Sequence, residues 1–197
     1  MTKENTLIQH LIGSIEIALF MDKGVKRFEV KPHSLARSFA IPLCLLPLSL
    51  ITVLYAHPSE NLTTGSIQAL SFIYVLRLAL YLSAFIGFVY LMAKAMDKMD
   101  EFKRFIIANN WIGVPAALLT LIPVSLFLGG FYSWAEIYPV MIFATLYSCA
   151  CTGFMASKVL RIPTELAAFI AITGMMINYN ALDFVKWAAI ETLSFIA

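Results

Sequence analysis

A single arginine interrupts the apolar stretch 67–93, in which Arg77 is the only charged residue. Its guanidinium keeps its charge at every pH that a folded protein meets, and an ion among apolar side chains needs a polar or charged partner. An arginine in such a place is a candidate site for an anionic substrate. The structural alternative is that Arg77 extends toward the helix end or pairs with Glu60, Glu136 or Asp183.

Polar side chains also gather at the end of the apolar stretch 165–183, where Asn180 and Asp183 lie. This end should be level with Arg77 if the two stretches are antiparallel neighbours. Since Glu136 begins its own helix and can point into water, we expect Asp183 to be the ionic partner of Arg77. The polar groups would then either face one water-filled pocket or only meet lipid headgroups.

Two adjacent amides, Asn109 and Asn110, open the apolar stretch 106–128 and precede Trp111. Asparagine at such a position bonds across helices or caps a helix start, and tryptophan is typical of a membrane interface. The same amides could line an entry path for a solute. We expect packing or capping, and keep both residues as candidates for a polar site with Arg77.

No set of side chains predicts catalysis. His10, His33 and His57 lie outside the apolar stretches and, in the topology derived below, on both sides of the membrane, so they cannot converge. The sequence contains no HExxH motif, no phosphate-binding loop and no pair of carboxylates within an apolar stretch. We therefore expect no enzyme and no cofactor. Cys149 and Cys151, two residues apart on a helix, face different sides, which argues against a metal site.

The elements that must position these residues are membrane-spanning helices. The 197-residue chain is 60% hydrophobic and 13% charged, with a mean hydropathy of +0.82. Soluble domains are about 45–50% apolar and about 25% charged. Five stretches are near the roughly 20 residues that a helix needs to cross the hydrocarbon. We predict an all-α membrane bundle over 36–183 with spans at 36–56, 67–93, 106–128, 137–157 and 165–183.

The fourth span carries small residues spaced for close helix packing. Ser148 and Thr152 are four residues apart, and Cys149 and Gly153 form a second such row beside them. Small side chains let two backbones approach, and the resulting dispersion contacts drive helix association in lipid. We expect these four residues to pack against a neighbouring helix or a second copy of the chain.

Charge sets the orientation. Twelve of the fourteen Lys and Arg residues lie before or at the start of the first span or in the second and fourth connections, and the other two connections hold none. Positive charge is retained in the cytoplasm, so we expect a cytoplasmic N-terminus and, after five spans, an outer C-terminus.

The two ends of the chain form separate regions. Residues 6–21, within a cytoplasmic lead-in over 1–35, have helical apolar spacing and basic residues after them. This helix would lie on the inner membrane surface or pack on the ends of the bundle. Residues 184–197 are apolar but too short to span, which predicts an outer interfacial tail, with an extended fifth helix as the alternative.

The order of these parts resembles small alphaproteobacterial inner-membrane proteins of Yip1-like topology. The amphipathic lead-in that ends at Ser38-Phe39-Ala40, the string Ala108-Asn109-Asn110-Trp111 and the five spans carry the resemblance. It implies the architecture and an inner-membrane location. The acidic-glycine motifs of the eukaryotic proteins, which act as scaffolds near trafficking GTPases, are not present in this sequence.

These observations favour a non-enzymatic scaffold that organises partners in the inner membrane. The alternative is a component of a small-molecule or ion transporter or channel that uses polar groups around Arg77 and Asp183. The expected partners are the lipid bilayer and either a second copy of the chain or another membrane protein. No basic cluster indicates nucleic acid, because the positive charge follows the sides of the membrane.

Overall fold

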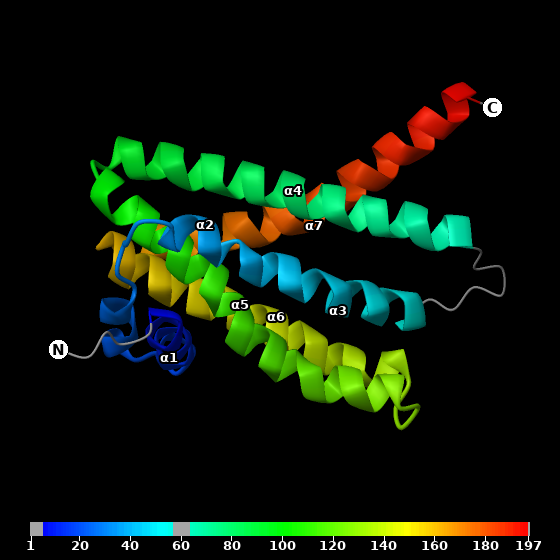
Figure 1. Cartoon of the computed structure of the whole chain (residues 1–197), viewed down its shortest axis with the longest axis horizontal. Coiled ribbons are helices and arrows are strands. Elements are labelled where there is room, and N and C mark those ends of the chain that lie inside the picture. The colour runs from blue at the N-terminus through cyan, green and yellow to red at the C-terminus, as the bar shows by residue number, and fades with distance from the viewer. Residues whose placement is uncertain (1–5, 57–63, 197) are drawn as a thin grey trace.

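The computed structural model describes residues 6–56 and 64–196. Helices and short turns make up these residues, and neither range contains a strand. In chain order the elements are α1 (Thr6–Ala18), the 3-10 helix η1 (Asp22–Arg27), α2 (Ser34–Ser38), α3 (Ala40–Ala56), α4 (Thr64–Ala95), α5 (Met99–Leu128), α6 (Trp134–Leu160) and α7 (Thr164–Ile196) (Figure 1).

The prediction of five long apolar helices is confirmed. Each of α3 to α7 contains most or all of a run that is long and apolar enough to cross a membrane, and the first run begins in α2. α4 to α7 extend beyond the expected apolar limits, whereas α3 begins at Ala40, four residues after the expected start of the first span. α5 starts at Met99 and carries Asp100 and Glu101 in its first turn, where carboxylates complement the helix dipole.

α7 continues from Thr164 to Ile196 without a break (Figure 1). Of the two alternatives for the C-terminal segment, the structure therefore has the extended fifth helix in place of a separate interfacial tail. The segment 184–196 contains neither glycine nor proline. No residue there ends the helix, and each further turn satisfies more backbone hydrogen bonds.

α5 is the central helix of the bundle. It packs against α6, α3, α4 and the short helices α1 and α2, while α7 lies against both α6 and α4. α3 and α4 contact each other sparsely. α4, α5, α6 and α7 therefore form a closed ring, and α3 lies against α5 with a loosely packed seam toward α4.

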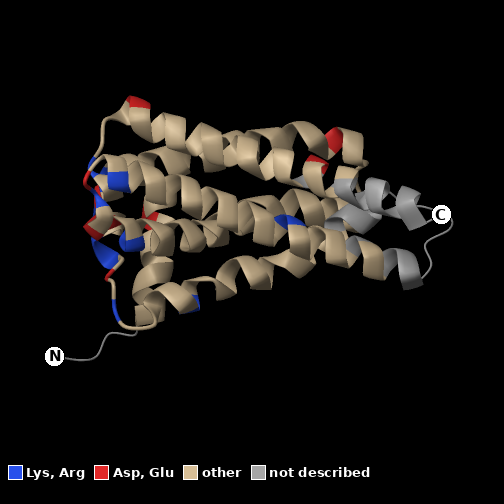
Figure 2. Cartoon of the chain, turned by 90° about the horizontal axis from the view of Figure 1, so that it is seen from above, with Lys and Arg blue, Asp and Glu red and all other residues tan. Residues whose placement is uncertain are grey.

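The hydrophobic core lies at one end of this bundle. It combines the first part of α5 and α7 with the last part of α4 and α6. Ile17 of α1 and Phe28, the residue after η1, also belong to it. Figure 2 shows Lys and Arg gathered at one end of the molecule. We call it the basic end, and it holds Lys94, Lys98, Lys103, Lys158 and Arg161. The buried core therefore lies just inside the basic end.

α6 and α7 approach closely at Gly153. A Cβ atom built there would lie 3.7 Å from the Ala171 Cβ atom and 3.8 Å from the Ala167 carbonyl oxygen. These are ordinary van der Waals distances, so the gap has room for a methyl group and for nothing larger. The structure thus places Gly153 at a helix contact within the chain.

We expect Gly153→Leu to lower the melting temperature of the detergent-purified protein. Overpacking a close contact costs about 1–3 kcal/mol, although leucine is the better helix former. Gly153→Ala should be neutral or stabilising because its methyl group fits. The matched control is Ala150→Leu, since Ala150 is exposed on the same helix. If Gly153→Leu melts at the same temperature as Ala150→Leu, α6 does not need this close approach.

Candidate functional sites

Arg77 projects from the middle of α4 toward α7. Its Nη2 atom donates a hydrogen bond of 3.1 Å to Oδ1 of Asn178, and its guanidinium carbon lies 5.6 Å from the ring centre of Tyr74. Its Nε atom is buried and has no hydrogen-bond partner among the described residues. A guanidinium has five N–H donors, so most of the N–H groups of Arg77 have no acceptor among the described residues.

The expected ion pair between Arg77 and Asp183 is wrong. Asp183 is exposed, and no ion pair joins it to Arg77 in the described part of the chain. Asp183 follows Asn178 by five residues, which rotates it about 140° around α7, so its carboxylate faces away from α4. Glu136 is also engaged elsewhere, since its carboxylate accepts hydrogen bonds of 2.7 Å from the Ser133 backbone N–H and hydroxyl. Glu60 lies outside the described residues.

A cavity of about 220 Å³ lies beside Arg77, between α3, α4 and α7. Its polar lining comes from Arg77, Ser49, Tyr74 and Asn178. Pro42 and three leucines form the rest of the wall. The cavity adjoins the loosely packed seam between α3 and α4.

Asn178 also lines a second cavity of about 130 Å³, which lies among α4, α5, α6 and α7. Asn109 reaches this cavity from α5, and α6 contributes Ser148, Cys149 and Thr152 together with Thr145. The structure thus brings Arg77 and Asn109 to neighbouring cavities on the two sides of Asn178. Three of the four small residues of α6 line the inner cavity, while Gly153 contacts α7 directly.

The other two candidates lie elsewhere. The Asn110 side chain is buried and donates a hydrogen bond of 2.9 Å to the Ser38 hydroxyl, which joins α5 to α2. Asn180 is exposed and donates to the backbone carbonyl of Met176 within its own helix. The five candidate polar residues therefore do not form one site.

Sequence reasoning ranked Asn180 above Asn178, although helical spacing distinguishes them. The buried stripe of α7 runs through Ala167, Ala171, Gly174, Ala181 and Val185. Asn178 falls on this stripe, four residues after Gly174, whereas Asn180 and Asp183 fall beside it. A polar residue on the buried face of an apolar helix was the signal that could have identified Asn178.

A second site is formed by the lead-in, whose helix α1 buries polar side chains beside Ile17 against η1 and the bundle. His10, Ser14 and Glu16 are buried there, while the opposite face of the helix is exposed. The large exposed side chains on and just after α1 are all apolar: Leu7, Ile8, Ile12, Ile15, Leu19, Phe20 and Met21. We call these seven residues the outer stripe. A helix on a water-soluble core usually exposes polar side chains, whereas α1 buries three of them and leaves this apolar stripe exposed.

Charged groups and close glycines hold α1 to η1. Arg27 donates from Nε and Nη2 to the two carboxylate oxygens of Glu16, at 2.7 and 2.9 Å, and from Nη1 to Gln9 at 2.7 Å. These hydrogen bonds hold the pKa of Glu16 below its usual value. A Cβ atom on Gly24 would lie 2.7 Å from the Gly13 carbonyl oxygen, so the two segments touch at their backbones.

His10 lies between the lead-in and the bundle. Its ring stacks on Phe28 with centres 5.3 Å apart and meets the edge of Trp111 in α5 at 5.6 Å. Burial lowers its pKa below 6.5, a hydrogen bond with the Glu29 backbone opposes this shift, and the nearby Lys31 charge adds to it. The buried position between Phe28 and Trp111 therefore favours the neutral imidazole of His10.

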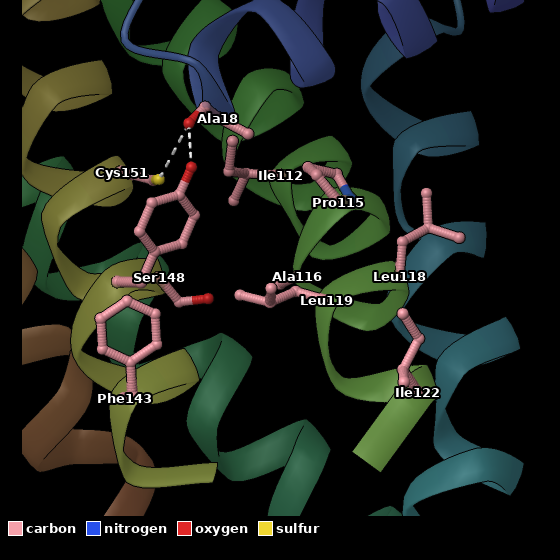
Figure 3. Close-up of a pocket in the computed structure, with 11 residues that line it drawn as sticks. Ala18, Ile112, Pro115, Ala116, Leu118, Leu119, Ile122, Phe143, Ser148 and Cys151 are labelled. Carbon is pink, nitrogen blue, oxygen red and sulfur yellow. Dashed lines mark hydrogen bonds between the residues drawn. The ribbon is translucent and has the colours of Figure 1, made fainter. Parts of the chain in front are cut away.

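The C-terminus of α1 closes one end of an apolar groove between α5 and α6, with a volume of about 410 Å³ (Figure 3). The Ala18 carbonyl accepts a hydrogen bond from the Tyr147 hydroxyl, and the Cys151 sulfur lies 3.9 Å from the same oxygen. Figure 3 shows Phe143 on one wall and Leu118 and Ile122 on the other. The groove thus continues from the lead-in along the side of the bundle.

Within the described residues, no group of three or more His, Cys, Asp or Glu side chains could hold a metal ion. Comparison with protein-family models, with curated proteins and with solved structures found no match for this chain. The function must be argued from its own residues.

We expect the stability of the lead-in to fall as the pH drops below 6.5. A pKa that is lower in the folded state than in the unfolded state means that the unfolded chain takes up the proton first. The contribution of His10 is therefore complete above pH 6.5 and is lost as the pH falls through the folded pKa. Melting followed by tryptophan fluorescence between about pH 8 and 5 measures this, since His10 touches Trp111.

The matched control for this prediction is His10→Gln, which cannot titrate. Its melting temperature should vary less with pH than that of the wild type over the same range. Glu16 does not interfere, because its lowered pKa moves its own effect below 4.5. If the melting temperatures of the two proteins depend on pH in the same way, protonation of His10 does not affect the stability of the lead-in.

Proposed function

We propose that this chain is a non-enzymatic multi-pass protein of the inner membrane that organises lipid and membrane partners through its cytoplasmic lead-in. The observation that carries the proposal is the orientation of α1, which buries three polar side chains and leaves the outer stripe exposed to its surroundings. The Yip1-like resemblance of the sequence belongs to this proposal and agrees with a scaffold.

The outer surface of the bundle supports the membrane location. Large apolar side chains are exposed along the outer surfaces of α3 to α7, among them Phe72, Leu91, Ile122, Phe143 and Phe169. Soluble monomers rarely expose continuous apolar surface over more than a few hundred Å². Lipid around the bundle removes the free-energy cost of exposing this apolar surface to water. The basic end then faces the cytoplasm, because positive charge is retained there.

The outer stripe lies at the same end, and this position favours the inner leaflet as its environment. It continues into the apolar groove below Ala18, so lipid chains could cover both without an intervening polar surface. Lys23 and Lys26 are exposed just after the stripe. Basic residues at this level attract anionic headgroups, each by about 1 kcal/mol. A second copy of the chain or another membrane protein could share the same surface.

We expect a spin label at Ile15 to lie in the hydrocarbon and a label at Lys26 to lie in water. Both residues are exposed, so labelling should not disturb the fold. In vesicles, with the native cysteines replaced by serine, the Ile15 label should be several-fold more accessible to oxygen than to a water-soluble nickel chelate. The Lys26 label should show the reverse.

The same position tests the organisation of lipid. A fluorophore at Ile15 should transfer energy more efficiently to labelled phosphatidylglycerol than to labelled phosphatidylcholine, because Lys23 and Lys26 enrich the anionic lipid. The double variant Lys23→Gln/Lys26→Gln should lose this preference and keep the depth of Ile15. A label at Ile15 that is as open to the nickel chelate as one at Lys26 would contradict the proposal.

A second candidate function is transport of a small solute, and one observation favours it. Asn178 lines both cavities, so polar groups follow one another from Arg77 to Asn109 between the helices. Polar residues that face the interior of a membrane bundle are typical of a solute path. In this reading the sparse contact between α3 and α4 gives access to the outer cavity.

For this candidate we expect the reconstituted protein to allow a flux of small anions across vesicles. Asn178→Leu should reduce the flux at least about tenfold, since it places an apolar side chain where the cavities meet and raises the barrier by more than ~1.4 kcal/mol. Asn180→Leu is the matched control, because Asn180 is exposed on the same helix. A wild-type flux no greater than that of empty vesicles removes the transport function.

A further inference from the structure

We propose that Arg77 and Asn178 form a binding site for a phosphate-type oxyanion in the cavity between α3, α4 and α7. The ligand is a tetrahedral phosphate, either free or as the phosphodiester of a lipid headgroup. The site goes beyond the organising role and does not depend on it. It also does not require that the ligand cross the membrane.

The charge of Arg77 is the first argument. No carboxylate among the described residues pairs with it, since Glu136 caps its own helix and Asp183 faces outward. The amide of Asn178 and the ring of Tyr74 stabilise the cation only in part. A cation among apolar helices without a countercharge is costly, so an anion gains binding energy by supplying it.

The arrangement of donors is the second argument. The Nε atom of Arg77 is buried without a protein partner, and Arg77, the Ser49 hydroxyl and the Asn178 amide line the same cavity. A guanidinium presents parallel N–H groups that match two oxygens of a phosphate. The remaining oxygens can accept from the Asn178 amide, and from the Ser49 hydroxyl if it releases the Leu46 carbonyl, to which it donates at 2.7 Å.

The size of the cavity and its position along α4 limit which ligands it can hold. The cavity of about 220 Å³ is smaller than the roughly 300–1,000 Å³ of sites for drug-sized molecules, so it suits a single phosphate group. Arg77 lies ten residues from Ile67, where the apolar stretch of α4 begins, which is roughly 15 Å along the helix. A lipid phosphate would reach this depth only if its headgroup entered the seam between α3 and α4.

The test compares melting temperatures of the full chain, purified in an uncharged detergent, with and without ligand. The probes are inorganic phosphate, a short-chain phosphatidic acid, and the matching uncharged diacylglycerol with chloride at equal ionic strength. We expect phosphate or phosphatidic acid to raise the melting temperature by roughly 3–6 °C at ten times its Kd. The uncharged lipid with chloride should have no such effect.

Two variants and one control make the result specific. Arg77→Gln should abolish the response, and so should Asn178→Asp, which supplies an internal carboxylate to Arg77. Asn178→Asp should also melt no lower than the wild type without ligand, so loss of the response cannot be attributed to misfolding. Arg37→Gln removes an exposed arginine at the basic end and should keep the full response.

The pattern of responses identifies the source of the phosphate. A response to inorganic phosphate supports a soluble ligand, and a response to phosphatidic acid alone supports a headgroup. If neither probe stabilises the wild type, the site does not exist. The proposal is also overturned if the ligand still raises the melting temperature of both Arg77→Gln and Asn178→Asp.

Discussion

The packed core just inside the basic end is the constraint on which the rest of the structure depends. The first half of α5 supplies Phe105, Ile107 and Trp111 to it, and the lead-in, α4, α6 and α7 all reach this region. Close packing of large side chains fixes the helices relative to one another there. Among the residues whose burial is described, fewer side chains are buried toward the opposite end, where the cavity beside Arg77 lies.

The lead-in shows how a helix can bury its polar face. Glu16 is tolerated inside because Arg27 donates two hydrogen bonds to it, and the Ser14 hydroxyl donates to the Leu11 carbonyl. Buried polar groups are stable when they are paired in this way. The apolar face is then free to meet a nonaqueous surface, which would be unfavourable for a helix that faces water. The orientation of α1 is therefore the strongest physical support for a role at the membrane surface.

Arg77 differs from Glu16, because its neighbours accept hydrogen bonds from only some of its N–H groups. A structural arginine in an apolar bundle would be expected beside a carboxylate, and here an amide and an aromatic ring take that place. The nearest acidic residue along α7, Asp183, is directed away by helical rotation. An arginine beside a cavity, with N–H groups that no protein acceptor uses, is a candidate functional residue for either proposed function.

The sequence by itself determined the all-helical class and the five apolar helices, because composition and the length of apolar runs report directly on the environment of each segment. It could not determine which faces meet. Asn178 and Asp183 are both polar and near each other in the chain, yet only Asn178 falls on the stripe that α4 and α6 bury. The apolar spacing of α1 was readable, but only the packing on α5 decided that its polar side turns inward. Side-chain partners depend on the rotation and register of helices far apart in the sequence, and tertiary packing alone sets these.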